Sequence, residues 1–303
     1  MSVIGYLSSR TADSDASMLV SFRRGLGDVG YAEGRNAVIE YRFADGRYDR
    51  VYAQLTDLTQ RKVGVIVLAA PGAIERLRQQ VRASPIPIVF SIGGDPVRLG
   101  YVASMNRPGG NVTGVASLVA QLSGKRLSLL HDLVPKAATI AVLVDDPEER
   151  SRELIELQEA REAAAALRQK LLVLNASAAD EIDAQFARLE REPADAMLVT
   201  TSPFFLTRAG QIAALAARHR IPAIYPRREF VEAGGLMSYG NNVADNYREL
   251  GRYAGRILNG ERPADLPVIQ PTRYELVINL KAAKALNLTI PPGMYAIADE
   301  VIE

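Results

Sequence analysis

The stretch PIVFSIGGDPVRLGYVASMNRPGGNVTGV, residues 87–115, contains two strand signals separated by two clusters of turn-forming residues. It begins with the apolar run PIVFS, breaks at a Gly-Gly-Asp-Pro loop, and passes through NRPGGN into the β-branched run VTGV. In an open α/β sheet, ligands bind just beyond the carboxyl ends of the strands. We therefore expect Ser91–Asp95 to form a binding edge, and NRPGGNVTG to lead the chain toward a second lobe.

Strand and helix patterns alternate on both sides of this stretch. Upstream, apolar or alternating runs predict strands at 3–9, 38–43 and 63–69, with residues at helical spacing between them. Downstream the alternation restarts, and strands are predicted at 139–145, 170–176, 196–201 and 222–226. Residues at helical spacing predict a helix that includes Leu118 and Leu133 and another at 204–220. This pattern predicts an α/β fold with two doubly wound parallel sheets, each in a lobe of ordinary domain size.

One strand–helix pair and one further strand remain after the two halves are complete. The simplest arrangement returns the chain to the first lobe near Ser238 and to the second lobe near Pro271. We predict an N-terminal lobe of residues 1–114 plus 240–269 and a C-terminal lobe of residues 115–239 plus 270–303. Three crossovers would then form a hinge beside a cleft that holds one small ligand.

Composition argues against several other classes of protein. The formal net charge is +1 with interspersed signs, which gives no basic surface for nucleic acid. Cysteine is absent, and His131 and His219 are the two histidines. There is no GxSxG elbow, P-loop or histidine pair at metal-ligand spacing, so we expect no enzyme, cofactor or metal site. No apolar run approaches the ~20 residues of a membrane span.

Several runs resemble the ABC-transporter substrate-binding proteins of the tryptophan/tyrosine-binding type. The most specific are NRPGGNVTG and QPTRYELVINLKAAKAL, and YAEGRNAVIEYRFADGRYDR and ADEVIE also match. The sequence departs from that family at AAPGAIERL (69–77) and at Asp145-Asp146-Pro147, where relatives carry a Thr/Gly-rich turn and an Asn-Pro. Both departures fall where the resemblance places ligand contacts.

The resemblance implies a type I periplasmic binding protein that captures a solute and delivers it to an inner-membrane ABC permease. The implied ligand is a small carboxylate, above all an aromatic or hydrophobic amino acid, and the implied protein is a monomer that closes by hinge motion. It would be periplasmic or lipid-anchored outside the inner membrane, as a mature form without its signal peptide. The alternative is the ligand-sensing core of a transcription regulator or signalling receptor, which shares the fold; the start at a strand, without a DNA-binding headpiece, disfavours a regulator.

Candidate ligand contacts in the first half lie at the ends of three predicted strands: Ser8, Ser9, Ala70, Pro71, Gly72, Ser91 and Asp95. Ser8 and Ser9 either hold a carboxylate beside free helix N–H groups or cap their own loop. Ala70-Pro71-Gly72 offers backbone amides, although Pro also suits the first turn of any helix. Ser91 can donate to a carboxylate. Asp95 precedes Pro96 and favours capping of a turn over binding an ammonium group.

Candidates in the second half follow the same rule: Asp145, Thr201, Ser202, Tyr225, Tyr239 and Asn241. Asp145 can pair with an α-ammonium, because a buried charge needs a partner, whereas Asp146 is typical of a helix cap. Tyr225 can stack on an aromatic ligand. Tyr239 and Asn241 lie at the predicted second crossing, where the alternative for Asn241 is a turn residue.

Overall fold

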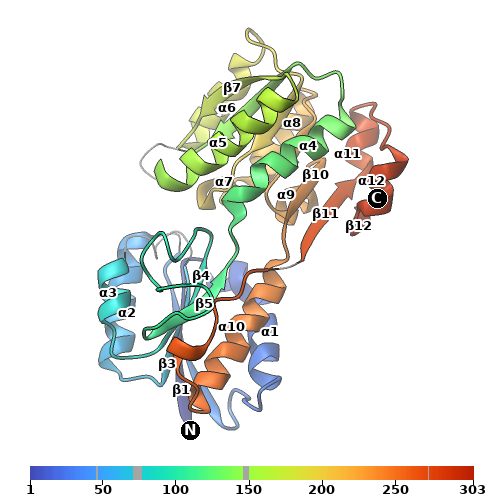
Figure 1. Cartoon of the computed structure of the whole chain (residues 1–303). Helices are drawn as coiled ribbons and strands as arrows, with labels where there is room; N and C mark the ends of the chain where they lie inside the picture. The colour runs from blue at the N-terminus through green and yellow to red at the C-terminus, as the bar shows by residue number, and fades with distance from the viewer. Residues whose placement is uncertain (46, 71–76, 146–149, 272) are drawn as a thin grey trace. The chain divides into compact units, whose positions relative to one another are not determined.

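The computed structural model describes residues 1–45, 47–70, 77–145, 150–271 and 273–303. The chain divides into two compact units, each with its own sheet and helices (Figure 1). Unit 1 comprises Met1–Leu118 and Asn242–Thr272, and unit 2 comprises Val119–Asn241 and Arg273–Glu303. The chain therefore passes from one unit to the other three times. The limits fall at 118, 241 and 272, where the sequence predicted 114, 239 and 269.

Unit 1 contains a five-stranded sheet in the order β2-β1-β3-β4-β5, with every neighbouring pair parallel. Its strands are β1 (Ser2–Ser8), β2 (Ala37–Phe43), β3 (Val65–Ala69), β4 (Ile88–Ile92) and β5 (Val112–Ala116). All five residues of β3, β4 and β5 are buried, as expected of parallel strands covered on both faces.

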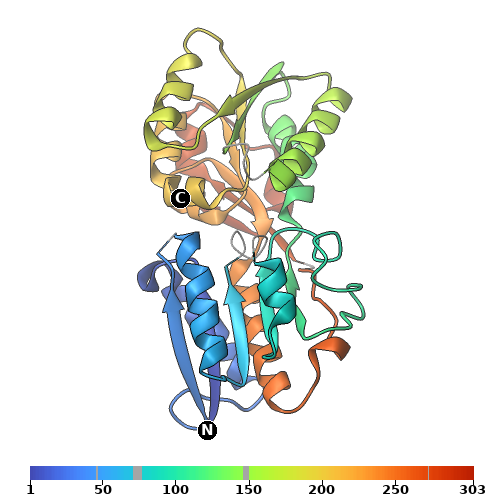
Figure 2. The same cartoon turned by 90° about the vertical axis from the view of Figure 1, so that its left-hand side faces the viewer.

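Helices cover both faces of this sheet (Figures 1 and 2). On one face lie α1 (Ala12–Gly27) and α10 (Val243–Leu258), which pack side by side and share a core with Phe22 and Leu250. On the other face lie α2 (Tyr48–Gln60) and α3 (Arg78–Ala83), with Leu55 and Val81 in the core. Thr11 begins α1 with a capping box, in which its side chain and that of Ser14 bond each other's backbone N–H. A short 3-10 helix, η4 (Pro263–Asp265), follows α10.

Unit 2 contains a seven-stranded sheet in the order β12-β11-β10-β9-β8-β6-β7. The strands are β6 (Thr139–Val144), β7 (Lys170–Asn175), β8 (Ala196–Val199), β9 (Ala223–Tyr225), β10 (Met237–Asn241), β11 (Tyr274–Asn279) and β12 (Glu300–Ile302). The β10–β11 pair is antiparallel, and the other neighbours are parallel. The returning C-terminal segment thus enlarges the sheet of unit 2 at one side.

The helices of unit 2 also pack on both faces of its sheet. One core cluster joins the strands to α4 (Ser123–Leu133), α5 (Arg150–Ala166), α11 (Leu280–Ala285) and α12 (Pro292–Ile297). The other joins them to α6 (Ala179–Arg188), α7 (Pro203–Thr207), α8 (Ala209–Arg218) and α9 (Arg228–Glu232). In the described part of the chain, no helix has both the length and the apolar character that a membrane crossing requires.

The predicted α/β class with two doubly wound parallel sheets is confirmed. The strand at Ser238 belongs to the sheet of unit 2, and the chain leaves that unit after Asn241. Two helix predictions are wrong. The helix predicted to include Leu118 begins later: Leu118 has a left-handed φ of 45°, and a 3-10 turn, η2 (Val119–Leu122), precedes α4. The helix predicted at 204–220 is two helices, α7 and α8.

Candidate functional site

The carboxyl edge of the unit 1 sheet begins where β1 ends at Ser8. The Ser8 side chain is buried, and its Oγ accepts a hydrogen bond of 3.1 Å from the backbone N–H of Arg10. Ser9 is partly exposed beside it. The loop-capping role that the sequence allowed for Ser8 is therefore present. Ser9 and Arg10 are the more exposed polar groups of this turn.

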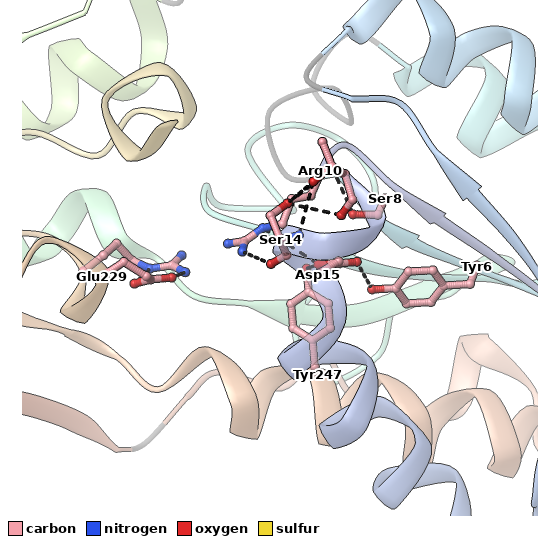
Figure 3. A network of polar contacts seen from close by, with 9 residues as sticks. Tyr6, Ser8, Arg10, Ser14, Asp15, Glu229 and Tyr247 are labelled. Atoms are coloured by element: carbon pink, nitrogen blue, oxygen red, sulfur yellow. Dashed lines mark hydrogen bonds and ion pairs between the residues drawn. The ribbon is translucent and has the colours of Figure 1, made fainter. Parts of the chain in front are cut away.

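Arg10 and Asp15 form a polar network at this edge that the sequence did not predict (Figure 3). Arg10 Nη1 donates to the carbonyl of Ser14 at 3.3 Å, and Arg10 Nε lies 3.9 Å from Asp15 Oδ1. The carboxylate of Asp15, fully buried on the first turn of α1, accepts 2.6 Å and 3.5 Å hydrogen bonds from the hydroxyls of Tyr6 and Tyr247. A guanidinium is thus held at the end of β1 by a buried carboxylate behind it.

Burial dominates the electrostatics of this network. It raises the pKa of Asp15, while hydrogen bonds from Tyr6 and the charge of Arg10 act in the opposite direction. Burial also raises the pKa of Tyr6, assisted by Tyr247 and by the adjacent Asp15. Tyr6 therefore remains a neutral hydrogen-bond donor. The sequence signal for this network was weak, because Asp15 in the run TADSD resembles an ordinary acidic first turn of a helix.

The other unit 1 candidates follow β3 and β4. Ala70 is buried directly after β3, and Pro71 and Gly72 lie outside the described residues. Ser91 lies within β4 and is 8% exposed. Asp95 Oδ1 accepts hydrogen bonds from the backbone N–H groups of Val97 and Arg98, at 2.8 and 3.3 Å. Asp95 thus has the turn-capping role that the sequence favoured for it.

At the carboxyl edge of the unit 2 sheet, Asp145 and Ser202 lie together. Asp145 follows β6, and the Ser202 hydroxyl donates a short hydrogen bond to Asp145 Oδ2. The same Ser202 oxygen accepts from the backbone N–H of Phe205 at 3.2 Å, which caps α7. Next to it, the backbone N–H of Thr201 donates to Glu156 Oε2 at 2.9 Å. The structure therefore brings three predicted residues into one cluster.

Arg126 and Glu156 form a buried ion pair next to this cluster, and neither residue was predicted from the sequence. Arg126 Nη1 lies 3.7 Å from Glu156 Oε2, and the two side chains are 0% and 1% exposed. Burial lowers the pKa of Arg126, and the charge of Glu156 counters this shift. A signal was present in the sequence, because Arg126 shares the apolar face of α4 with Leu130 and Leu133 at helical spacing.

The predicted tyrosines occupy different environments. Tyr225 is fully buried and stacks on Phe230 with a centroid distance of 4.9 Å, so its ring belongs to the core of unit 2 in this structure. Tyr239 is partly exposed on β10, with its ring centroid 6.0 Å from that of Tyr274. Asn241, which ends β10, is 6% exposed. Of these residues, Tyr239 presents the most accessible aromatic surface at the predicted edge.

In the described ranges, no cluster of three or more histidine, aspartate or glutamate side chains could hold a metal ion. The polar groups at the two edges are instead cations, carboxylates and hydroxyls. Such groups suit the recognition of a charged organic molecule by hydrogen bonds and ion pairs.

Comparison with known proteins gives a consistent result. A family model described as "ABC transporter substrate binding protein" matches residues 11–302. A tyrosine-binding protein of Clostridioides difficile is 26% identical over 267 residues, which cover 88% of this chain and 75% of that protein. The similarity therefore extends across both units.

Solved structures show the same fold. A conserved domain protein from Vibrio cholerae superposes with a TM-score of 0.86 at 23% identity, covering 99% of each chain. An ABC domain from Streptococcus pneumoniae, in complex with L-Trp, superposes with a TM-score of 0.85 at 24% identity, also covering 99% of each chain. Both units of the chain therefore adopt the fold of type I periplasmic binding proteins.

Proposed function

Because the chain belongs to the ABC transporter substrate-binding protein family, we propose that it is the solute receptor of an importer and binds an aromatic or hydrophobic amino acid. The observation that carries the proposal is the similarity to a tyrosine-binding protein over 88% of this chain. The structural neighbour in complex with L-Trp supports the same class of ligand. The family is extracytoplasmic, and we infer that this chain acts in the periplasm and docks with an inner-membrane permease.

The carboxyl edge of unit 1 matches the carboxylate of an amino acid. Arg10 supplies a guanidinium that is 21% exposed, and Ser9 supplies a hydroxyl beside it. A guanidinium can form two parallel charge-assisted hydrogen bonds with a carboxylate. Asp15 holds this guanidinium from behind, so less side-chain entropy is lost when a ligand binds.

The carboxyl edge of unit 2 carries groups suited to an ammonium group and to an aromatic side chain. Asp145 supplies a carboxylate for an ammonium group. The hydrogen bond that the Ser202 hydroxyl donates to this carboxylate fixes the orientation of the carboxylate. Tyr239 supplies an aromatic surface, and an aromatic pair stabilises binding by about 0.5–1.5 kcal/mol beyond the buried area. We propose these two residues as ligand contacts in unit 2.

Isothermal titration calorimetry with L-Trp, L-Tyr, L-Phe and L-Leu tests the proposal, with L-Glu and D-glucose as controls. Thermal unfolding in the presence of each compound provides an independent measurement. At a ligand concentration of 100 Kd, binding raises the free energy of unfolding by about 2.7 kcal/mol. We expect at least one aromatic amino acid to bind and the controls to give no response. A protein that responds to none of the four amino acids would contradict the proposed ligand class.

A further inference from the structure

Arg126 is the largest side chain that is fully buried in the described part of unit 2, and it is charged. It lies on the first turn of α4, a few residues after the chain enters unit 2 at Val119. A buried guanidinium strongly destabilises a protein unless hydrogen bonds and an opposite charge compensate for its lost hydration. The contacts of Arg126 therefore show what its burial achieves.

One contact connects Arg126 to the strand that ends at the second crossing. Arg126 Nε donates a hydrogen bond of 2.8 Å to the backbone carbonyl of Tyr239, which is 113 residues away in the sequence. Tyr239 lies on β10, whose last residue, Asn241, is also the last of this segment of unit 2. Arg126 thus joins the beginning of the segment Val119–Asn241 to its end. Each end of this segment lies next to one of the three crossings.

The second contact connects Arg126 to the turn after β8. Glu156 Oε2 lies 3.7 Å from Arg126 Nη1 and accepts from the backbone N–H of Thr201 at 2.9 Å. The Ser123 hydroxyl donates to the same oxygen at 3.4 Å. The next residue in the turn, Ser202, donates to Asp145. A continuous series of polar contacts therefore runs from β10 through the ion pair to the predicted ligand contacts after β6 and β8.

Two apolar side chains would fill this space without the cost of removing two charges from water. Replacing a buried ion pair with apolar residues of similar volume is often neutral or stabilising, so this pair is poorly explained as a source of stability alone. Apolar residues would, however, leave the Thr201 amide and the Tyr239 carbonyl without these partners. The ion pair instead positions the backbone, because its hydrogen bonds hold the Thr201 amide and the Tyr239 carbonyl at the edge of the sheet.

We propose that Arg126 and Glu156 are positioning residues that hold Thr201, Ser202 and Tyr239 in the arrangement that a ligand requires. The identity of the ligand, an amino acid, rests on the proposed function, whereas the positioning of these residues does not. Neither side chain needs to touch the ligand, since both are buried beneath the edge. Their effect reaches the ligand through the backbone of the turn after β8 and through β10.

The double variant Arg126→Met/Glu156→Leu tests the proposal, because it removes both charges together and leaves neither buried alone. Its control is Arg188→Gln/Glu192→Gln, which removes an exposed ion pair of 2.7 Å on α6 in the same unit. Two readouts are needed: amide hydrogen exchange at Thr201 in the ligand-free protein, and the Kd for L-Trp and L-Tyr. The melting temperature of each variant reports whether it remains folded.

We expect the double variant to fold with nearly wild-type thermal stability, to exchange the Thr201 amide faster and to bind the amino acid more weakly. The exchange rate and the Kd should each rise about tenfold, because one hydrogen bond to a charged group contributes about that factor. The control should match the wild type in both. Wild-type exchange at Thr201, or faster exchange with an unchanged Kd, would overturn the proposal.

A failure of the proposed function can be distinguished from a failure of the positioning role. If the wild type binds no aromatic amino acid, the proposed ligand is wrong, and exchange at Thr201 alone decides whether the pair positions the turn. If the double variant does not fold, Arg126→Lys provides the comparison, because lysine keeps the charge but lacks the planar guanidinium. Because this variant loses the Nε–H that holds the Tyr239 carbonyl, we then expect a folded protein that binds the amino acid more weakly, and a wild-type Kd would overturn the proposal.

Discussion

Gly251 of α10 packs directly against the backbone carbonyl of Phe22 in α1: a Cβ atom at position 251 would overlap with that oxygen and lie 2.8 Å from the backbone nitrogen of Leu26. A second glycine, Gly25, makes the reciprocal contact with the carbonyl of Arg248. The two helices come from opposite ends of the sequence of unit 1. Glycine at both positions lets their backbones approach so closely that α10 covers the sheet beside α1.

Gly251→Ala should destabilise unit 1. The added methyl group meets backbone atoms that cannot move independently, so we expect a loss of about 1–3 kcal/mol, as for other overpacked sites. The urea midpoint, followed by circular dichroism, measures the change. Gly27→Ala is the matched control, since nothing lies within 4 Å of a Cβ there, and alanine is favoured over glycine in a helix by about 1 kcal/mol. A wild-type midpoint for Gly251→Ala would contradict the close helix contact.

Tyr6→Phe should destabilise the protein more at pH 7.5 than at pH 4.5. The variant removes the 2.6 Å hydrogen bond to buried Asp15, which costs about 1–3 kcal/mol when an acceptor is left unsatisfied. Burial already raises the pKa of Asp15, and the hydrogen bond from Tyr6 lowers it, so the variant raises it further. A raised folded-state pKa gives stability at low pH that is lost as the pH rises through it.

Urea unfolding of wild type and Tyr6→Phe at the two pH values checks this prediction. Tyr31→Phe is the control, because its hydroxyl makes an exposed 3.1 Å hydrogen bond to an uncharged amide, that of Asn259. We expect a small loss for Tyr31→Phe that is the same at both pH values. Equal losses of unfolding free energy for Tyr6→Phe at both pH values would show that ionisation of Asp15 does not contribute to the destabilisation.

Asp28→Asn should lower the stability of the protein near neutral pH and have much less effect in strong acid. Hydrogen bonds from Arg248, and then from Arg252, lower the pKa of Asp28 to about 2. A lowered folded-state pKa gives stability above the ordinary pKa of a free aspartate, and that stability is lost as the pH falls through the folded value. The difference in melting temperature between wild type and variant should therefore shrink as the pH falls from about 5 to about 2.

Salt provides the control for Asp28. The carboxylate lies at the surface, so its interaction with the two arginines should weaken as ionic strength rises. We expect the wild type and Asp28→Asn to become more similar in 1 M NaCl at pH 6, where the Debye length is about 3 Å. A difference that persists unchanged at pH 2 would contradict the assignment of this stability to the ionised carboxylate.

Arg10→Gln should weaken binding of an aromatic amino acid by about 10- to 100-fold, the range for losing a hydrogen bond between charged groups. Binding of the corresponding amide, which has no carboxylate, should weaken less, and calorimetry with L-Trp and L-tryptophanamide measures both. Arg47→Gln is the control, since that side chain is 59% exposed and pairs with Asp49. Equal losses for both ligands would show that Arg10 does not recognise the carboxylate.

The sequence predicted the parts of the fold that depend on periodicity. Buried strands such as β3 and amphipathic helices such as α1 are encoded by consecutive residues, so they could be placed from the pattern alone. The turn at Leu118 could not, because a left-handed φ in a residue with a branched side chain is intrinsically unfavourable and depends on the surrounding structure. The antiparallel pairing of β10 with β11 likewise depends on contacts between distant segments.

The candidate sites were predicted from their positions at strand ends. Asp95 has the turn-capping role that the sequence favoured, and Ser202, which was predicted as a ligand contact, caps α7. The two buried networks were missed for a common reason. The sequence does not reveal whether a charged side chain, such as that of Asp15 or Arg126, turns toward solvent or toward the core. That choice is decided by partners such as Tyr247 and Glu156, which come from other elements.

The interleaving of the two units limits how far each unit can fold while the chain is being synthesised. Helix α10, which covers one face of the unit 1 sheet, is made only after nearly all of unit 2, and unit 2 gains β11 only after the chain has returned to it. A nascent chain that has grown to residue 240 therefore holds two apolar surfaces that have no cover yet. Neither unit can complete its core until residues 242–303 have been synthesised.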